Sequence, residues 1–122
     1  MSEAGDCVVA LWHAMESRDW SKVADLLSPE FRAEFPQSAE RFDRSGFLKL
    51  NRDYPGDWHI QIRHLVDGGE WVVTEIEVEI DGRTDRGVSF FRVHNGRIVS
   101  IREFWPEAFP VPEWRRGSAL NE

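Results

Sequence analysis

The segment from residue 96 to residue 105 constrains both the fold and the function of this chain. With the two-residue period of a β-strand, Val99, Ile101, Glu103 and Trp105 share one face. The opposite face carries Ile98, Ser100, Arg102 and Phe104. One carboxylate therefore lies between an isoleucine and a tryptophan. Because burying a carboxylate is costly, Glu103 belongs either to a functional site or to a structural pair.

The second half of the chain keeps this two-residue period over four segments. It predicts strands at residues 58–66, 70–80, 87–93 and 96–105, with turns at 67–69, 81–83 and 94–96. Strands that follow one another through tight turns form an antiparallel meander. We therefore predict a meander of four long strands.

The first half has helical periodicity instead. Apolar residues recur every three or four positions in residues 7–18, after Asp6 as N-cap, and again in residues 20–27, before Pro29. A short strand at 31–35, a polar loop at 37–41 and a third helix at about 44–53 follow. Helices followed by a sheet predict an α+β fold in which the helices cover one face of the sheet.

Length, charge and composition limit the class of protein. The chain has 122 residues, enough for one domain, and its net charge of −7 disfavours nucleic acid or an anionic membrane as a partner. It has no apolar stretch long enough to span a bilayer. A single cysteine and four scattered histidines form no zinc-ligand pattern. We expect a cytoplasmic protein with no metal and no cofactor.

Three stretches carry a family resemblance: Arg18-Asp19-Trp20, Leu26 to Phe31, and the closing segment Asn95 to Trp105. They resemble the SnoaL-like branch of the nuclear transport factor 2 superfamily, which includes ketosteroid isomerase, polyketide cyclases and limonene epoxide hydrolase. Residues 35–41, 51–56 and 112–115 are similar to a subgroup of small bacterial SnoaL-like proteins. The resemblance implies one domain over residues 1–122, with a core at about 6–110 and a C-terminal tail at 111–122.

The resemblance also implies a cone-shaped, curved antiparallel sheet wrapped around the N-terminal helices. A pocket is expected between its concave face and the first and third helices, and many members form homodimers through the outer face. On this scaffold the inward set of one strand is Val72, Thr74, Ile76, Val78 and Ile80, and that of the next is Ser89, Phe91 and Val93. The outward line Glu75, Glu77 and Glu79 needs cross-strand cations such as Arg63, Arg92 or Arg102.

The sequence departs from ketosteroid isomerase at the functional positions of that enzyme. Ser89 and Phe35 stand where the resemblance places its two aspartates, and the tyrosine of its first helix falls at or next to Leu11 and Trp12. Steroid isomerisation is therefore not the expected reaction.

Glu103 is the strongest catalytic candidate. A carboxylate between Ile101 and Trp105 on a concave apolar face is desolvated, which raises its pKa and lets it give or take a proton near neutrality. The alternative is that Glu103 forms an ion pair with a buried arginine or a hydrogen bond to a helix, and that its role is purely structural.

Two further catalytic candidates are His64, on the strand face of Trp58, Ile60 and Ile62, and Tyr54, whose hydroxyl suits a ligand carbonyl. Tyr54 has the alternative role of packing the end of the third helix. Gln37 and Asn51 are expected at the polar rim, although loop residues there also suit turn and cap hydrogen bonds. The remaining ligand-binding residues are expected to be Trp12, Met15, Phe35, Trp58, Ile76, Ser89, Phe91, Ile101 and Trp105.

The sequence thus predicts a homodimeric, cofactor-free domain that binds a small, largely apolar molecule. One interpretation is an enzyme that transfers protons, of the isomerase, cyclase, dehydratase or hydrolase type. The alternative is a non-catalytic ligand-binding or dimerisation module.

Overall fold

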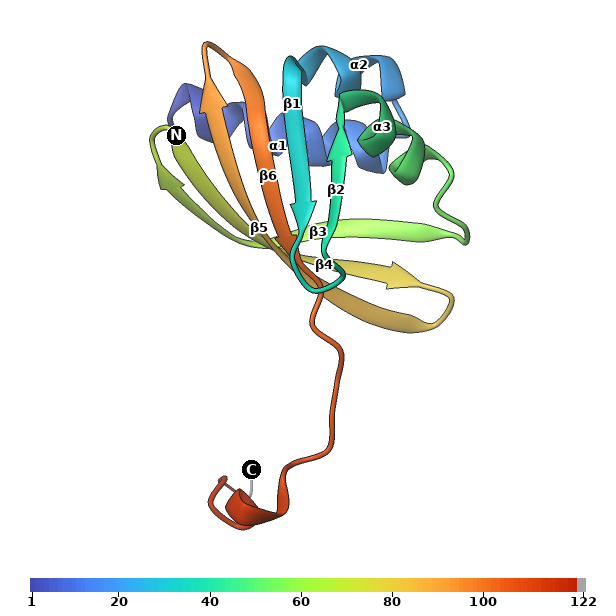
Figure 1. Cartoon of the computed structure of the whole chain (residues 1–122), viewed down its shortest axis with the longest axis vertical. Helices are drawn as coiled ribbons and strands as arrows, with labels where there is room; N and C mark the ends of the chain where they lie inside the picture. Colours follow the sequence, from blue (N-terminus) through green and yellow to red (C-terminus); the bar gives the residue numbers. More distant parts are fainter. Residues whose placement is uncertain (121–122) are drawn as a thin grey trace.

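A computed structural model describes residues 1–120 and contains three α-helices and six β-strands over that range (Figure 1). The helices are α1 (Glu3–Glu16), α2 (Trp20–Leu26) and α3 (Arg44–Arg52). The strands are β1 (Leu27–Phe35), β2 (Glu40–Asp43), β3 (Trp58–Gly68), β4 (Trp71–Ile80), β5 (Arg83–His94) and β6 (Arg97–Phe104). None of the helices described has both the length and the apolarity that crossing a membrane requires.

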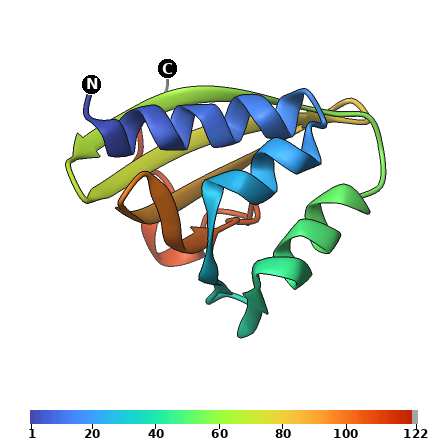
Figure 2. The same cartoon turned by 90° about the horizontal axis from the view of Figure 1, so that it is seen from above.

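All six strands form one curved sheet in the order β2-β1-β6-β5-β4-β3. The predicted meander is confirmed, because β3 to β6 pair antiparallel in chain order. β1 then lies parallel to β6 and carries β2 at the edge. Figure 2 shows the three helices along one side of the curved sheet, as the α+β prediction requires.

The inner and outer faces of β4 and β5 follow the predicted alternation. On β4 the residues facing the helices are Val72, Thr74, Ile76, Val78 and Ile80, all buried. On β5, Ser89, Phe91 and Val93 are buried, whereas Phe90 and Arg92 are exposed. The two-residue period of a β-strand is therefore enough to assign these side chains to the inner or the outer face of the sheet.

Two β-bulges break the alternation that the sequence predicts for the flanking strands. The register between β5 and β6 shifts between Arg92 and Val93, which turns Ile98 inward, fully buried, and leaves Val99 half-buried. The prediction that Val99 shares the face of Ile101 is therefore wrong. A second shift lies in β3 between Ile62 and His64. A bulge adds one unpaired residue, so every side chain beyond it changes face.

The N-terminal elements differ from the prediction at their boundaries. Helix α1 begins at Glu3, capped by Ser2, whose hydroxyl accepts from the Gly5 amide at 3.1 Å, and not by Asp6. Leu27 belongs to β1, which contains Pro29. The β1 register with β6 shifts between Leu27 and Arg32, so proline sits where the ladder is interrupted. The predicted loop at 37–41 is also wrong in part, since β2 begins at Glu40.

Aromatic pairs join the helices to the sheet. Trp12 of α1 meets Phe91 of β5 edge-on, with ring centroids 5.8 Å apart, and its Nε1 donates to Thr74 Oγ1 at 3.2 Å. Phe47 of α3 packs on Phe31 of β1 at 5.1 Å. These contacts hold α1 and α3 over the sheet and leave space between them.

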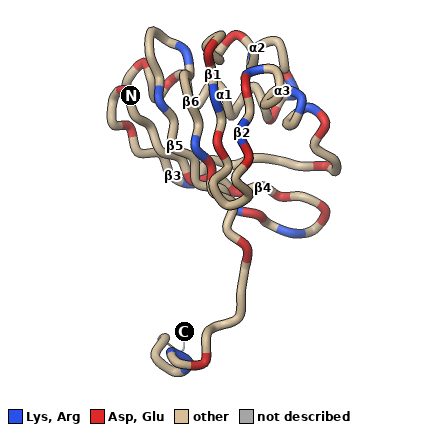
Figure 3. Tube along the Cα trace, in the orientation of Figure 1, with Lys and Arg blue, Asp and Glu red and all other residues tan. Residues whose placement is uncertain are grey.

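Positions of Lys and Arg are interspersed with positions of Asp and Glu along the Cα trace (Figure 3). Glu77 pairs with Arg63 at 3.0 Å, which confirms a neutralising arginine for the glutamate line of β4. Arg92 and Arg102 pair with other acids, at 3.2 and 3.3 Å. The line is therefore a cross-strand charge ladder.

Phe91 lies at the centre of the contact between α1 and the sheet. We predict that Phe91→Ala lowers the free energy of unfolding by about 3–5 kcal/mol, because it leaves a cavity beside Trp12. Val66→Ala, at a side chain that is 64% exposed, is the control and should cost far less. Urea unfolding followed by circular dichroism measures both. Equal losses at the two positions would contradict this packing.

Candidate functional site

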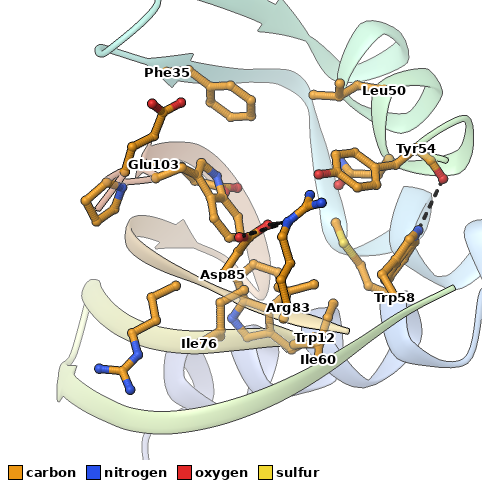
Figure 4. Close-up of a pocket in the computed structure, with 17 residues that line it drawn as sticks. Trp12, Phe35, Leu50, Tyr54, Trp58, Ile60, Ile76, Arg83, Asp85 and Glu103 are labelled. Atoms are coloured by element: carbon orange, nitrogen blue, oxygen red, sulfur yellow. Dashed lines mark hydrogen bonds and ion pairs between the residues drawn. The ribbon is translucent and has the colours of Figure 1, made fainter. Parts of the chain in front are cut away.

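A cavity of about 510 Å³ opens between the inner face of the sheet, α1 and α3 (Figure 4). Helix α1 contributes Trp12 and Met15, and α3 contributes Leu50 and Asn51. The sheet supplies the remaining wall through β1, β3, β4, β5 and β6. The pocket therefore lies between the concave face and the two helices, where the resemblance implies it.

The walls of this cavity are mainly apolar. Of the predicted ligand-binding residues, Trp12, Met15, Phe35, Asn51, Trp58, Ile76 and Trp105 line it. Leu50, Ile60 and Val78 also line it; none was predicted to bind the ligand, although Val78 was expected to face inward. Phe91, Ile101 and Ser89 are buried but are not among the lining residues. They form the layer that supports the wall.

Glu103 lies in the wall of the cavity and is only 4% exposed. Burial disfavours the charged form and raises the pKa of its carboxyl to about 7, against the smaller opposing effect of one hydrogen bond. That bond comes from the indole Nε1 of Trp105, which donates to Oε2 at 3.0 Å. Near neutral pH the carboxyl is therefore divided between its protonated and ionised forms.

The structural alternative for Glu103 requires a partner that neutralises it. Within residues 1–120, no arginine, lysine or histidine side chain forms an ion pair with Glu103. Its neighbour across the sheet is Ser89, and next to Ser89 lies Thr74. The Ser89 hydroxyl is buried with no hydrogen-bond partner in the described chain. The inner face thus carries a buried polar row, Thr74, Ser89 and Glu103, beside an apolar cavity.

Two residues hold Trp105 against Glu103. Gly87 lies directly against the indole, and a Cβ at this position would fall 2.7 to 2.9 Å from three ring atoms. Gln37 Oε1 accepts a hydrogen bond from the backbone N–H of Trp105 at 2.5 Å. Gln37 does not line the cavity, so its predicted place at the rim is wrong. It anchors the end of β6 instead.

The far side of the pocket is built on Trp58. The Arg18 guanidinium stacks on its ring, 3.4 Å from the centroid, and donates to its carbonyl oxygen. Tyr54 meets Trp58 edge-on at 6.5 Å and is 44% exposed. Tyr54 therefore stands in the wall near solvent, where it both packs the end of α3 and presents its ring to the cavity.

Charged residues on β5 line the cavity and were not predicted. They are Arg83, Asp85 and Arg86, joined by Glu107 from the tail. Arg83 pairs with Asp85 at 3.2 Å, and Arg86 reaches Glu77 at 3.5 Å. The turn at 81–83 and a strand beginning at 87 were expected, but β5 begins at Arg83. Extending the alternation from Ser89 back to residue 83 could have found Asp85 and Arg83, but it places Arg86 on the opposite face, beside Glu77.

His64 does not belong to the pocket. Its side chain is 78% exposed, and its Nδ1 lies 2.6 Å from Glu75 Oε1 on the outer face. The bulge between Ile62 and His64 turns it away from the face of Trp58 and Ile60. The prediction that His64 is catalytic from the inner face is therefore wrong. Among residues 1–120 there is also no group of three or more His, Cys, Asp or Glu side chains suited to a metal ion.

A family model described as the SnoaL-like domain matches residues 8–101. The chain belongs to this family. A search of curated proteins found no match. Solved structures place the SnoaL-like fold within the nuclear transport factor 2 superfamily, as the sequence resemblance implies.

Three solved structures have a fold similar to that of this chain. A candidate ketosteroid isomerase from Kribbella flavida is 27% identical, with a TM-score of 0.92 over 98% of this chain and 90% of that one. An LEH-like epoxide hydrolase of M. tuberculosis is 22% identical, with a TM-score of 0.71 over 85% and 83%. Wild-type IdmH of Streptomyces antibioticus, a candidate polyketide cyclase, is 19% identical, with a TM-score of 0.70 over 82% and 89%. Their names cover several reactions on one fold.

The raised pKa of Glu103 predicts a specific dependence of stability on pH. The unfolded carboxyl titrates near 4.5 and the folded one near 7, so between these values the folded state binds the proton more tightly. The free energy of unfolding should fall by about 3 kcal/mol more in the wild type than in Glu103→Gln as the pH rises from 4.5 to 8. Urea titrations at several pH values measure the difference. Parallel curves for the two proteins would exclude a raised pKa.

The close approach of Gly87 and Trp105 can be tested with Gly87→Ala. The added Cβ forces the indole to move, which should break its hydrogen bond to Glu103. We expect the Trp105 indole N–H resonance to shift in a ¹H–¹⁵N spectrum, and Thr84→Ala, at an exposed position of the same strand, to leave it in place. An unmoved resonance in Gly87→Ala would show that the ring does not rest on residue 87.

Proposed function

We propose that this SnoaL-like protein binds a small, largely apolar molecule and transfers a proton to or from it through Glu103. The observation that carries the proposal is a carboxyl group, 4% exposed and without a cationic partner in the described chain, in the wall of a ligand-sized cavity. Groups whose pKa burial brings near neutrality are concentrated at catalytic sites.

The size and the lining of the cavity support a small-molecule ligand. Its volume of about 510 Å³ lies within the range of about 300–1,000 Å³ that such pockets have. Aromatic side chains from three elements, Trp12, Phe35 and Trp58, offer flat apolar contacts. The bound molecule is therefore expected to bury its apolar body and to turn one polar group toward Glu103.

The chemistry follows from the two forms of the Glu103 carboxyl. The ionised form takes a proton from a carbon or a water molecule, and the protonated form gives one to a developing oxyanion. The Trp105 N–H stabilises the carboxylate when it forms. The Tyr54 hydroxyl is the candidate to polarise the ligand, because Tyr54 lines the cavity and Ser89 lies behind its wall. Isomerase, cyclase, dehydratase and hydrolase reactions all include such a step, and we expect no cofactor for it.

A second candidate function is ligand binding without turnover. It is favoured by Ser89 and Phe35, which occupy the positions where the resemblance places the two aspartates of ketosteroid isomerase. Glu103 would then fix the orientation of a ligand through a hydrogen bond. For either function we propose a homodimer joined through the outer face of the sheet; a cytoplasmic location stays a prediction from the sequence.

Exchange of hydrogen for deuterium separates the two functions without knowledge of the natural substrate. Small cyclic ketones that bind, as judged by saturation-transfer NMR, are incubated with the protein in D₂O, and exchange at the carbon next to the carbonyl is followed. We predict exchange that Glu103→Gln slows by about 10²–10⁴-fold, because the proton acceptor is lost. Asp85→Asn, which removes a carboxylate from the same cavity, is the control and should exchange ketones nearly as fast as the wild type.

Binding without exchange in the wild type would support the module without turnover. Exchange that survives unchanged in Glu103→Gln would instead exclude Glu103 as the proton acceptor. A circular dichroism spectrum of the variant guards against a loss caused by unfolding.

A further inference from the structure

Residues 106–120 form a tail that leaves the end of β6 and extends away from the helices and the sheet (Figure 1). Its large apolar side chains are exposed: Phe109 by 71%, Val111 by 51%, Trp114 by 83% and Leu120 by 81%. Single exposed apolar residues are ordinary, but four on one short segment mark a contact surface. The tail therefore has the character of a segment that another surface covers.

The tail has a defined backbone conformation, although it extends away from the helices and the sheet. Pro106, Pro110 and Pro112 restrict the backbone to extended conformations. A short 3-10 helix, η1 (Glu113–Arg115), follows and is closed by backbone bonds such as Ser118 N to Arg115 O at 3.2 Å. A segment stiffened in this way loses little conformational entropy when it docks, which favours binding.

The comparison with the Kribbella flavida protein supports this course. That match covers 98% of the chain, which leaves out only about two of its residues and therefore runs through most of the tail, at a TM-score of 0.92. The matches to the epoxide hydrolase and to IdmH cover 85% and 82%. Most of residues 106–120 therefore have aligned counterparts in that crystal structure.

The outer face of the sheet offers a surface for such a segment. An open groove of about 860 Å³ runs across it, and its apolar members include Trp71, 53% exposed, and Phe90, 39% exposed. Arg32 and Arg102 also line the groove. The two acidic residues of the tail, Glu107 and Glu113, form no ion pair within the described chain. The groove also contains Glu34 and Asp43, Arg102 pairs with Glu34 at 3.3 Å, and the tail carries Arg115 and Arg116, so charges of both signs lie on the two surfaces. The match between the tail and the groove therefore rests on their exposed apolar side chains.

We propose that the tail is an exchanged arm, which packs its Phe109 and Trp114 side chains on the outer sheet face of a second copy of this chain. A second copy is the occupant because the tail extends away from its own domain, which leaves its apolar side chains exposed, and because a two-fold pair would use the same tail and the same groove on both chains (Figure 1). The exchange goes beyond the proposed pairing of the outer faces, and it is independent of whether Glu103 transfers protons.

The exchange also bears on the pocket. The tail follows Trp105, and its first two residues, Pro106 and Glu107, line the same cavity as Glu103. A partner that grips residues 109–114 therefore fixes one rim of the pocket, so dimerisation and ligand binding are coupled.

Association is measured on the full chain by analytical ultracentrifugation over a range of concentrations. We expect a dimer whose dissociation constant rises at least 10-fold in Trp114→Ala, in Trp71→Ser and in a chain ended after Ala108. Ser118→Ala, in the same tail, is the control and should leave it unchanged. Circular dichroism confirms that each variant is folded.

Contacts are assigned in a dimer that mixes isotope-labelled and unlabelled chains. Isotope-filtered NOEs from the Trp114 ring to Trp71 or Phe90 of the other copy are the expected result. A monomeric full-length chain, a dimer that is indifferent to the loss of the tail, or NOEs from Trp114 only within one chain would each overturn the exchange. None of these outcomes decides whether Glu103 transfers protons, because deuterium exchange by the full-length wild type and Glu103→Gln tests that separately.

Discussion

The burial of one carboxyl group, Glu103, governs the architecture of this site. Desolvation raises its pKa to about 7, and a single N–H from Trp105 is the hydrogen bond it receives from the described chain. The Trp105 indole is positioned for that bond by two contacts. Its ring lies against Gly87, and the Trp105 backbone N–H donates to the Gln37 side chain. Three segments far apart in the sequence therefore converge on one acid. The sheet has to curve to bring them together, and the same curvature makes the cavity.

Much of the fold could be predicted from the sequence because side-chain periodicity reports local geometry. The alternation of β4, from Val72 to Ile80, and the meander that contains it follow from the two-residue period. A β-bulge cannot be recognised from this period. Its one inserted residue changes the face of every later side chain, as at Ile98 and His64. The parallel contact of β1 with β6 joins distant segments, and no local pattern encodes it.

The candidate site was predictable where inward-facing apolar residues define it. Trp12, Trp58 and Glu103 lie in the cavity as their patterns indicate. Arg83 was missed because a turn was expected at its position. Gln37 was assigned to the rim because it lies in a polar loop. Its hydrogen bond to Trp105 spans 68 residues of sequence, and the loop sequence alone cannot reveal such a contact. Polar residues are placed by tertiary contacts, and these depend on the whole fold.

The central claim is that Glu103 shares a proton near neutral pH inside a ligand pocket. An NMR titration of the ¹³C-labelled Glu103 side-chain carboxyl, assigned with Glu103→Gln, measures this directly. We predict a midpoint near 7 in the free protein, displaced when a cyclic ketone fills the cavity. A midpoint near 4.5, the ordinary value for glutamate, would contradict it, because a carboxyl that titrates there is solvated or paired and is not poised for proton transfer.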